Sequence, residues 1–131
     1  GHDSVECGLG YDVIIGGSGL VNDFYSGGQG ADEVRYSSAA AGIFVNLNMG
    51  FARTLGGGNA SAIGYDALAA IENVVSGAFS DFIYGSSLAN SIFAGLGDDT
   101  VNGLGGNDTI SGFGGDDRLI GGDGIDRIWG G

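Results

Sequence analysis

The sequence predicts an all-β fold, a parallel β-helix or β-roll solenoid of nonapeptide repeats with an irregular central segment. Three observations predict it: a repeat length of nine residues, one apolar residue in every repeat, and 30 glycines without a proline among 131 residues. In an α-helix nine residues turn through about 900°, so positions i and i+9 would lie on opposite faces. Each glycine inside a helix would also cost about 1 kcal/mol.

The repeat is clearest in the second half of the chain. An acidic or amide residue recurs every nine positions and an apolar residue follows two places later, as in Asp108 and Ile110. The best unit, GGDGIDRIW, runs from Gly121 to Trp129. We expect each unit to form a glycine-rich turn and a strand of about three residues with the apolar side chain inside. Two units would make a coil of about 18 residues, stacked at the ~4.8 Å strand spacing.

Two repeat blocks flank the irregular segment within one domain spanning residues 1–131. The first block covers residues 1–35, contains the unit GGQGADEVR, and has one step lengthened to eleven by a two-residue insertion. The second block covers residues 77–131. Both ends of the chain cut a repeat, and repeat arrays normally carry distinct capping ends. We therefore expect a fragment of a larger protein.

The central segment, residues 36–76, lacks the nine-residue rhythm and is expected to form longer coils. Its alternating run VNLNMGF at 45–51 predicts a strand. The glycines at 56–58 predict a loop, and DALAAI at 66–71 predicts one helical turn. Glu72 is in phase with the acidic column of the second block, so the regular stack should resume there.

The charge balance excludes several functions. Acidic residues number 16 and basic residues four, which gives a net charge of −12. Nucleic-acid binding needs clustered basic residues, and here they are scattered. An anionic membrane would repel the chain, and no apolar run is long enough to span a bilayer. The single cysteine, Cys7, cannot form an internal disulfide and is expected to be a passive thiol. Because small secreted domains without disulfides need another stabilising element, we expect a bound metal.

Stacked coils would place the repeat carboxylates over one another. Carboxylates about 5 Å apart repel by roughly 1–3 kcal/mol per pair, which a bound cation would offset. Calcium takes about 6–8 oxygen ligands in flexible geometry, whereas magnesium demands a tight octahedron. Zinc, copper and iron prefer His or Cys, and the chain has one of each. The columns are Asp81, Asp99 and Asp117 on one edge and Asn90, Asp108 and Asp126 on the other.

The motif Gly-Gly-x-Gly-x-Asp-x-apolar-x resembles the nonapeptide of RTX (repeats-in-toxin, hemolysin-type) calcium-binding proteins. The resemblance implies a parallel β-roll with several Ca²⁺ ions held between turns of consecutive coils. It also implies type I secretion and an extracellular or cell-surface location in a Gram-negative bacterium. The metal-binding residues that it implies are Gly8, Gly10, Asp12, Asp23, Gly28, Gly30, Asp32, Asp81, Asn90, Gly95, Gly97, Asp99, Gly106, Asp108, Gly115, Asp117, Gly122, Gly124 and Asp126.

The resemblance implies a calcium-binding module of a larger secreted protein that folds on calcium binding outside the cell. Two alternatives stay open: an accessory module of a secreted polysaccharide-modifying enzyme or hydrolase, and a segment of an RTX adhesin. The expected partners are calcium and, in those alternatives, polysaccharide or other domains of the parent protein. We expect a monomer without nucleic-acid partners or membrane insertion. No catalytic residue is predicted. The stacked repeat already explains the adjacent acids Asp98–Asp99 and Asp116–Asp117, and the serines have only His2 as a potential base.

Overall fold

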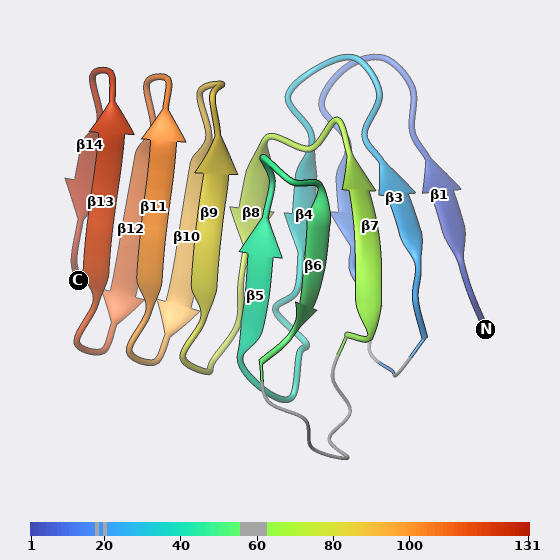
Figure 1. Ribbon diagram of the computed structural model, residues 1–131, viewed down its shortest axis with the longest axis horizontal. Helices are drawn as coiled ribbons and strands as arrows, with labels where there is room; N and C mark the ends of the chain where they lie inside the picture. The colour runs from blue at the N-terminus through green and yellow to red at the C-terminus, as the bar shows by residue number, and fades with distance from the viewer. Residues whose placement is uncertain (18, 20, 56–62) are drawn as a thin grey trace.

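The computed structural model describes residues 1–17, 19, 21–55 and 63–131, and within these ranges every regular element is a β-strand (Figure 1). The strands are β1 (Ser4–Glu6), β2 (Val13–Ile15), β3 (Phe24–Ser26), β4 (Glu33–Arg35), β5 (Ile43–Asn46), β6 (Phe51–Thr54), β7 (Tyr65–Ala69), β8 (Asn73–Val75), β9 (Phe82–Ser86), β10 (Ser91–Leu96), β11 (Thr100–Gly105), β12 (Thr109–Gly114), β13 (Arg118–Asp123) and β14 (Arg127–Trp129). The predicted all-β class is therefore confirmed. These ranges hold no helix that could cross a membrane.

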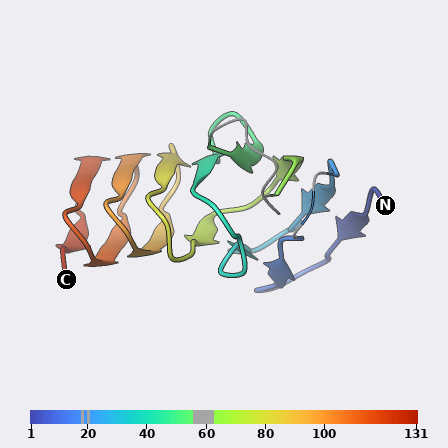
Figure 2. The ribbon, with the colours of Figure 1, turned by 90° about the horizontal axis from the view of Figure 1, so that it is seen from below.

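The chain passes back and forth between two sheets on opposite sides of a solenoid (Figure 2). An eight-stranded sheet has the order β1-β3-β7-β6-β5-β9-β11-β13, and a six-stranded sheet has the order β14-β12-β10-β8-β4-β2. Apart from the antiparallel β5–β6 and β6–β7 pairs, the strands pair in parallel with strands of neighbouring coils. The predicted parallel solenoid is thus confirmed.

Coil length differs between the two repeat blocks. In the second block equivalent residues are 18 apart, as for Ile83 and Val101, which matches the prediction. In the first block they are 20 apart, as for Val5 and Tyr25, because of the two-residue insertion. Strands β10 to β13 have six residues, more than expected, because their pairing continues into the glycine-rich part, where Gly95 pairs with Phe113.

The predicted apolar column forms the core between the sheets. Ile83, Ile92, Val101 and Ile110 are fully buried, while their strand neighbours face outward because side chains alternate along a strand. Burying one such side chain contributes about 1.5–3 kcal/mol. The core therefore gains a similar increment with every coil, and it places the turns of successive coils over one another at both edges.

The alternating run at 45–51 is a hairpin, so the prediction of one continuous strand is wrong. Strand β5 ends at Asn46, residues 47–50 form a tight turn, and β6 begins at Phe51 antiparallel to β5. The turn is closed by the side chain of Asn46, whose Oδ1 accepts the Met49 N–H at 2.9 Å. Gly50 follows with φ of +76°, a conformation that favours glycine.

The predicted helical turn at 66–71 is also wrong, because residues 65–69 are strand β7. This strand pairs with β3 in parallel and with β6 in antiparallel fashion. Its side chains alternate, with Asp66 and Leu68 buried and Tyr65 exposed. Sheet pairing on both sides overrides the helix propensity of its alanines. The predicted loop at 56–58 lies outside the described residues.

An aromatic ladder covers the outer face of the eight-stranded sheet over the hairpin. The ring of Phe51 stacks between those of Phe44 and Tyr65, with centroid distances of 5.5 and 5.3 Å. Phe44 also contacts Tyr84 of β9, and the Arg53 guanidinium lies 5.3 Å from the Phe44 ring centroid. Such aromatic pairs contribute about 0.5–1.5 kcal/mol each beyond burial, so the ladder fastens the hairpin to the coils on both sides.

Candidate metal centre

Two stacks of turns, one at each edge of the solenoid, carry the repeat carboxylates. The turns of the first edge lead into strands of the eight-stranded sheet, and those of the second edge lead into the six-stranded sheet. Each repeat unit contributes one acidic or amide side chain at or next to the start of its strand. The first edge holds Asp3, Asp23, Asp66, Asp81, Asp99 and Asp117, and the second holds Asp12, Asp32, Glu72, Asn90, Asp108 and Asp126.

One oxygen of each carboxylate is fixed by the neighbouring coil. Asp99 Oδ1 accepts the backbone N–H of Asp81 at 2.8 Å, and Asp117 Oδ1 accepts that of Asp99 at 3.0 Å. On the second edge Asp108 and Asp126 repeat the pattern, at 2.8 and 2.9 Å. This ladder confirms that residues 18 apart share an edge. It also holds like charges in stacked positions.

The second oxygen of four carboxylates has no hydrogen-bond partner among the described residues, although the atom is buried. These atoms are Oδ2 of Asp32, Asp99, Asp108 and Asp117. Those of Asp32, Asp108 and Asp117 point back across their own turns: Oδ2 of Asp108, for example, lies against Gly103, which begins the same unit. Buried charged oxygens are nearly always paired or bound to a metal. The four atoms are therefore the strongest structural indication of a cation between the turns.

Burial makes the bare carboxylates costly at these positions. It raises the pKa of Asp99 to about 6, and the charges of Asp81, Asp117 and Asp98 add to the increase. Burial likewise raises the pKa of Asp108, with a further contribution from the charge of Asp126. A positive ion between the turns would reverse both effects, because opposite charge favours the ionised form.

The glycine columns bring backbone carbonyls close to the carboxylates. Gly30 has φ of +150° and Gly124 has φ of +134°, and a methyl group at either would overlap a carbonyl of the preceding coil, that of Gly10 or Gly106. Leu104 and Phe113 replace a motif glycine and keep the same left-handed backbone, at +75° and +74°. The turn geometry therefore survives both replacements, although a side chain there is strained.

The donor set fits a hard cation held by mixed ligands. Among the described residues no three His, Cys, Asp or Glu side chains converge on one point, so carboxylates alone would not complete a site. Carboxylates next to stacked backbone carbonyls supply oxygen only, and calcium accepts both types in flexible geometry. Zinc and copper sites would need nitrogen or sulfur ligands.

The structure brings most of the predicted residues together in three groups. In the first block the second edge joins Gly8, Gly10 and Asp12 to Gly28, Gly30 and Asp32. In the second block the first edge joins Gly95, Gly97 and Asp99 to Gly115 and Asp117, and the second edge joins Gly106 and Asp108 to Gly122, Gly124 and Asp126. Each group stacks two consecutive turns.

Three predicted residues have their side chains engaged by other donors and acceptors. Tyr25 donates its hydroxyl to Asp23 Oδ2 at 3.1 Å, and the Ser76 hydroxyl donates to Asp81 Oδ2. Asn90 donates its amide N–H to the Glu72 carbonyl at 2.7 Å. Asp23, Asp81 and Asn90 lie in the predicted columns. Unlike Asp99 and Asp108, they have no buried side-chain oxygen left without a partner among the described residues.

Sequence reasoning missed two members of the carboxylate ladder. Asp66 accepts the backbone N–H of Asp23, and Glu72 accepts that of Asp32. Glu72 carried a usable signal, since it is nine residues before Asp81 and in phase with the repeat. Asp66 carried none, because the hairpin insertion puts it out of phase.

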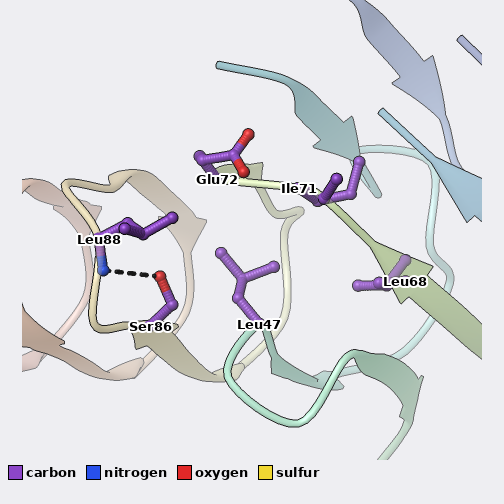
Figure 3. A pocket seen from close by; sticks show the side chains of 7 residues that line it. Leu47, Leu68, Ile71, Glu72, Ser86 and Leu88 are labelled. Atoms are coloured by element: carbon purple, nitrogen blue, oxygen red, sulfur yellow. Dashed lines mark hydrogen bonds between the residues drawn. The ribbon is translucent and has the colours of Figure 1, made fainter. Parts of the chain in front are cut away.

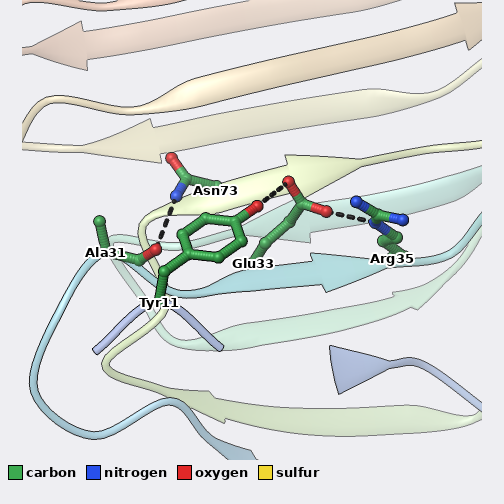
Figure 4. A network of polar contacts seen from close by, with 5 residues as sticks. All are labelled: Tyr11, Ala31, Glu33, Arg35 and Asn73. Carbon is green, nitrogen blue, oxygen red and sulfur yellow. Dashed lines mark hydrogen bonds and ion pairs between the residues drawn. The ribbon is translucent and has the colours of Figure 1, made fainter. Parts of the chain in front are cut away.

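A polar network on the outer face supports the second edge in the first block (Figure 4). The Tyr11 hydroxyl donates to Glu33 at 2.7 Å, and Arg35 pairs with the same carboxylate. The hydrogen bond to Glu33 raises the pKa of Tyr11. Asn73 of the next coil donates to the Ala31 carbonyl at 3.2 Å. The network ties β4 to both neighbouring coils without a metal.

A cavity of about 170 Å³ lies where the hairpin interrupts the stack (Figure 3). Leu47, Leu68, Ile71 and Leu88 give it apolar walls, and Glu72 lies at its margin. The Glu72 carboxylate accepts a backbone N–H and its carbonyl accepts the Asn90 amide. Ser86, which also lines the cavity, contacts the Asn90 side chain. The polar residues at the cavity are therefore already engaged in hydrogen bonds between coils or within a turn.

Comparison with known families agrees with the geometry. A four-copy model of the RTX calcium-binding nonapeptide repeat matches residues 1–34, 75–110 and 111–131, which is more than half of the chain. The unmatched stretch contains the hairpin and β7. No curated protein matches the chain. A repeated turn with orphaned carboxylate oxygens and a matching family model lead to one conclusion: the chain belongs to the RTX calcium-binding nonapeptide repeat family, and Ca²⁺ is the ion that it binds.

Proposed function

We propose that this chain is a calcium-dependent folding module of a secreted RTX protein, unfolded where calcium is scarce and ordered outside the cell. The observation that carries the proposal is a set of four buried carboxylate oxygens that have no partner within the described part of the chain, at Asp32, Asp99, Asp108 and Asp117. They lie in a chain with a net charge of −12. Without a counter-ion this arrangement opposes folding.

Calcium would be held by turns from consecutive coils. Asp32, Asp99, Asp108 and Asp117 would supply a charged oxygen, and the glycine columns would supply backbone carbonyls. Bound calcium would offset the repulsion between stacked carboxylates and satisfy the orphaned oxygens. The proposed ligand residues remain those predicted from the motif. Among them, Asp23, Asp81 and Asn90 are expected to bind most weakly, because other hydrogen bonds already engage their side chains.

The expected affinity is enough to control folding. Extracellular calcium modules bind with a Kd of about 0.1–1 mM. At 1 mM calcium a site with a Kd of 0.1 mM adds about 1.4 kcal/mol, and six such sites would add about 8 kcal/mol. That sum is comparable to the whole stability of an ordinary domain, about 5–15 kcal/mol. In a cytosol with sub-micromolar calcium the contribution disappears.

This dependence suits export of an unfolded chain through a type I secretion system, followed by folding outside a Gram-negative cell. The module itself is expected to be a monomer without catalytic activity, because its acids are accounted for by the ladder and by calcium. Its role is then structural: it folds in response to calcium as part of a secreted protein.

Calcium titration of the EDTA-treated protein tests the proposal. Circular dichroism should report a gain of β structure with calcium at about 0.1–10 mM, a range that covers the Kd of about 0.1–1 mM typical of extracellular sites. Magnesium at equal concentration should give much less. Asp108→Asn keeps the acceptor for Asn90 but loses the charged oxygen, so the calcium midpoint should rise about tenfold, equivalent to about 1.4 kcal/mol.

Asp116→Asn is the matched control, because Asp116 is exposed and lies outside the ladder. It removes the same charge and should move the midpoint less than about twofold. A complete β spectrum in EDTA, or equal midpoints for both variants, would contradict the proposal.

A further inference from the structure

The carboxylates of the two ladders differ in what their second oxygen meets. In Asp32, Asp99, Asp108 and Asp117 that atom is buried without a partner among the described residues. On the first edge, in the coils next to the hairpin, the equivalent atom of Asp23, Asp66 and Asp81 accepts a hydrogen bond from a side chain. On this edge the difference follows position along the solenoid, since Asp81 and Asp99 occupy the same place in their units. On the second edge Asp32 keeps an orphaned oxygen in the coil before the hairpin.

Two tyrosines supply the donor in the coils before the hairpin. Tyr36 is fully buried and donates to Asp66 Oδ2 at 2.9 Å, while Tyr25 donates to Asp23 Oδ2 at 3.1 Å. The Tyr25 hydroxyl in turn accepts the Gly17 N–H at 3.0 Å. Tyr25 stands in the apolar column, where the neighbouring coils have Val5 and Leu68. Tyr36 follows β4 at the place that Ser76 has after β8. The first edge is therefore closed by hydroxyl groups here.

A serine and an asparagine supply the donor in the coils after the hairpin. Ser76 is buried five residues before Asp81 and donates to its Oδ2. Asn90 replaces the carboxylate with an amide, whose N–H donates to the Glu72 carbonyl one coil earlier at 2.7 Å. This N–H stands where the other turns have the ladder oxygen. Asn90 Oδ1, in the place of the orphaned oxygen, accepts the backbone N–H of Ser86 at 2.7 Å. The amide therefore bridges two coils and leaves no charged oxygen at this turn.

We propose that hydroxyl and amide donors take the place of the cation around the hairpin, so that the central coils stay folded without calcium while the later coils require it. The inference rests on the proposed calcium-dependent folding and narrows it: without calcium the later coils unfold, and the coils around the hairpin do not. The aromatic ladder of Tyr65, Phe51, Phe44 and Tyr84 supports it, since these contacts join β7, β6, β5 and β9 without a metal. The folded central coils then offer β9 and β10 as strand edges on which the coils from β11 onward can add when calcium binds.

Hydrogen exchange measured by mass spectrometry, with 5 mM calcium and with EDTA, tests the inference on the whole chain. In EDTA, peptides covering β5, β6, β7 and β9 should keep protection, and peptides covering β11 to β14 should lose most of theirs. If both regions lose protection together in EDTA, the inference fails while calcium-dependent folding stands. If both keep it, calcium-dependent folding itself fails.

Two substitutions test the inference by adding a hydroxyl donor to one turn and removing it from the neighbouring one. Ala94 is fully buried five residues before Asp99, the same place that Ser76 has before Asp81. Ala94→Ser should give Asp99 Oδ2 a donor and raise the protection of β11 in EDTA about tenfold, as expected for a hydrogen bond to a charged group. Ser76→Ala should remove the donor from Asp81 and lower the protection of β9 in EDTA by a similar factor.

Ser87→Ala is the matched control, because Ser87 is exposed in the next turn. It should leave the exchange pattern unchanged. The gain expected from Ala94→Ser cannot be explained by a folding defect, so that variant keeps the test meaningful even if Ser76→Ala destabilises the protein. If protection in EDTA changes less than about twofold in both variants, the donors do not replace the cation.

Discussion

The fate of a single oxygen atom distinguishes otherwise equivalent residues of this protein. Asp81 and Asp99 stand at the same position of the nonapeptide, and both give one oxygen to the ladder. The second oxygen of Asp81 accepts the Ser76 hydroxyl, whereas that of Asp99 is buried without a partner among the described residues. Sequence reasoning predicted both as ligands because both keep the aspartate of the motif, although Phe79 replaces a motif glycine before Asp81. The difference depends on the residue five places earlier, the first glycine of the motif, which is replaced by Ser76 in one unit and by Ala94 in the other.

Glycine matters at the residue scale only where the coils approach closely. Gly124→Ala would place a methyl group on the Gly106 carbonyl at a φ of +134°. We expect a loss of about 1–3 kcal/mol of calcium-bound stability. Gly105→Ala is the control, since a methyl group there meets nothing closer than 3.8 Å and should change stability by less than about 1 kcal/mol. Urea unfolding in 5 mM calcium measures both, and equal losses would contradict the argument.

At the scale of elements, the sequence predicted the regular strands well and the central ones poorly. Each unit of the second block repeats one apolar residue, so its strands could be placed from the period alone. The hairpin β5–β6 and strand β7 have no period to reveal them. Asn46 and Gly50 form a turn inside an alternating run, and β7 is a strand only because β3 and β6 pair with it. Partners distant in sequence decide both elements.

Strand β7 also gives the calcium-free protein a pH dependence. Burial raises the pKa of Asp66 to about 6 from 3.8, an effect opposed by the Tyr36 hydrogen bond and increased by the charge of Asp23. The folded state therefore binds this proton more tightly than the unfolded state. The contribution to stability is complete below the unfolded pKa and is lost as the pH rises through 6.

In EDTA, the wild-type protein should therefore gain stability from pH 7 to pH 5 by more than Asp66→Asn does. The difference should not exceed about 1.4 kcal/mol per pH unit. Urea unfolding of both proteins at several pH values, followed by tyrosine fluorescence, measures it. Parallel pH profiles for the two proteins would show that Asp66 does not titrate in this range.

On the scale of the whole molecule, the sequence predicted the solenoid, its coil length and the two edges of carboxylates. These features follow from the period of nine, because equal units stacked in parallel bring like residues into register. The period could not reveal that the stack contains coils of two kinds. That division comes from Tyr36, Tyr25 and Ser76, which reach the ladder from positions outside the acidic column.

The net charge of −12 raises a question that belongs to the whole chain: whether calcium acts by general screening or by occupying sites. Screening acts on exposed charges and is nearly complete at 1 M salt, where the Debye length is about 3 Å. It does not reach buried oxygens such as Oδ2 of Asp108 and Asp117.

Sodium chloride at 1 M should therefore compact the EDTA-treated chain only in part, whereas 5 mM calcium should compact it fully. Small-angle X-ray scattering measures this as the radius of gyration, which for a compact chain of this length is about 14 Å and for an unfolded one about 37 Å, the elongated solenoid lying somewhat above the compact value. If sodium chloride alone gave the calcium value, repulsion between surface charges would account for the whole effect, and the stacked turns would need no bound ion to fold.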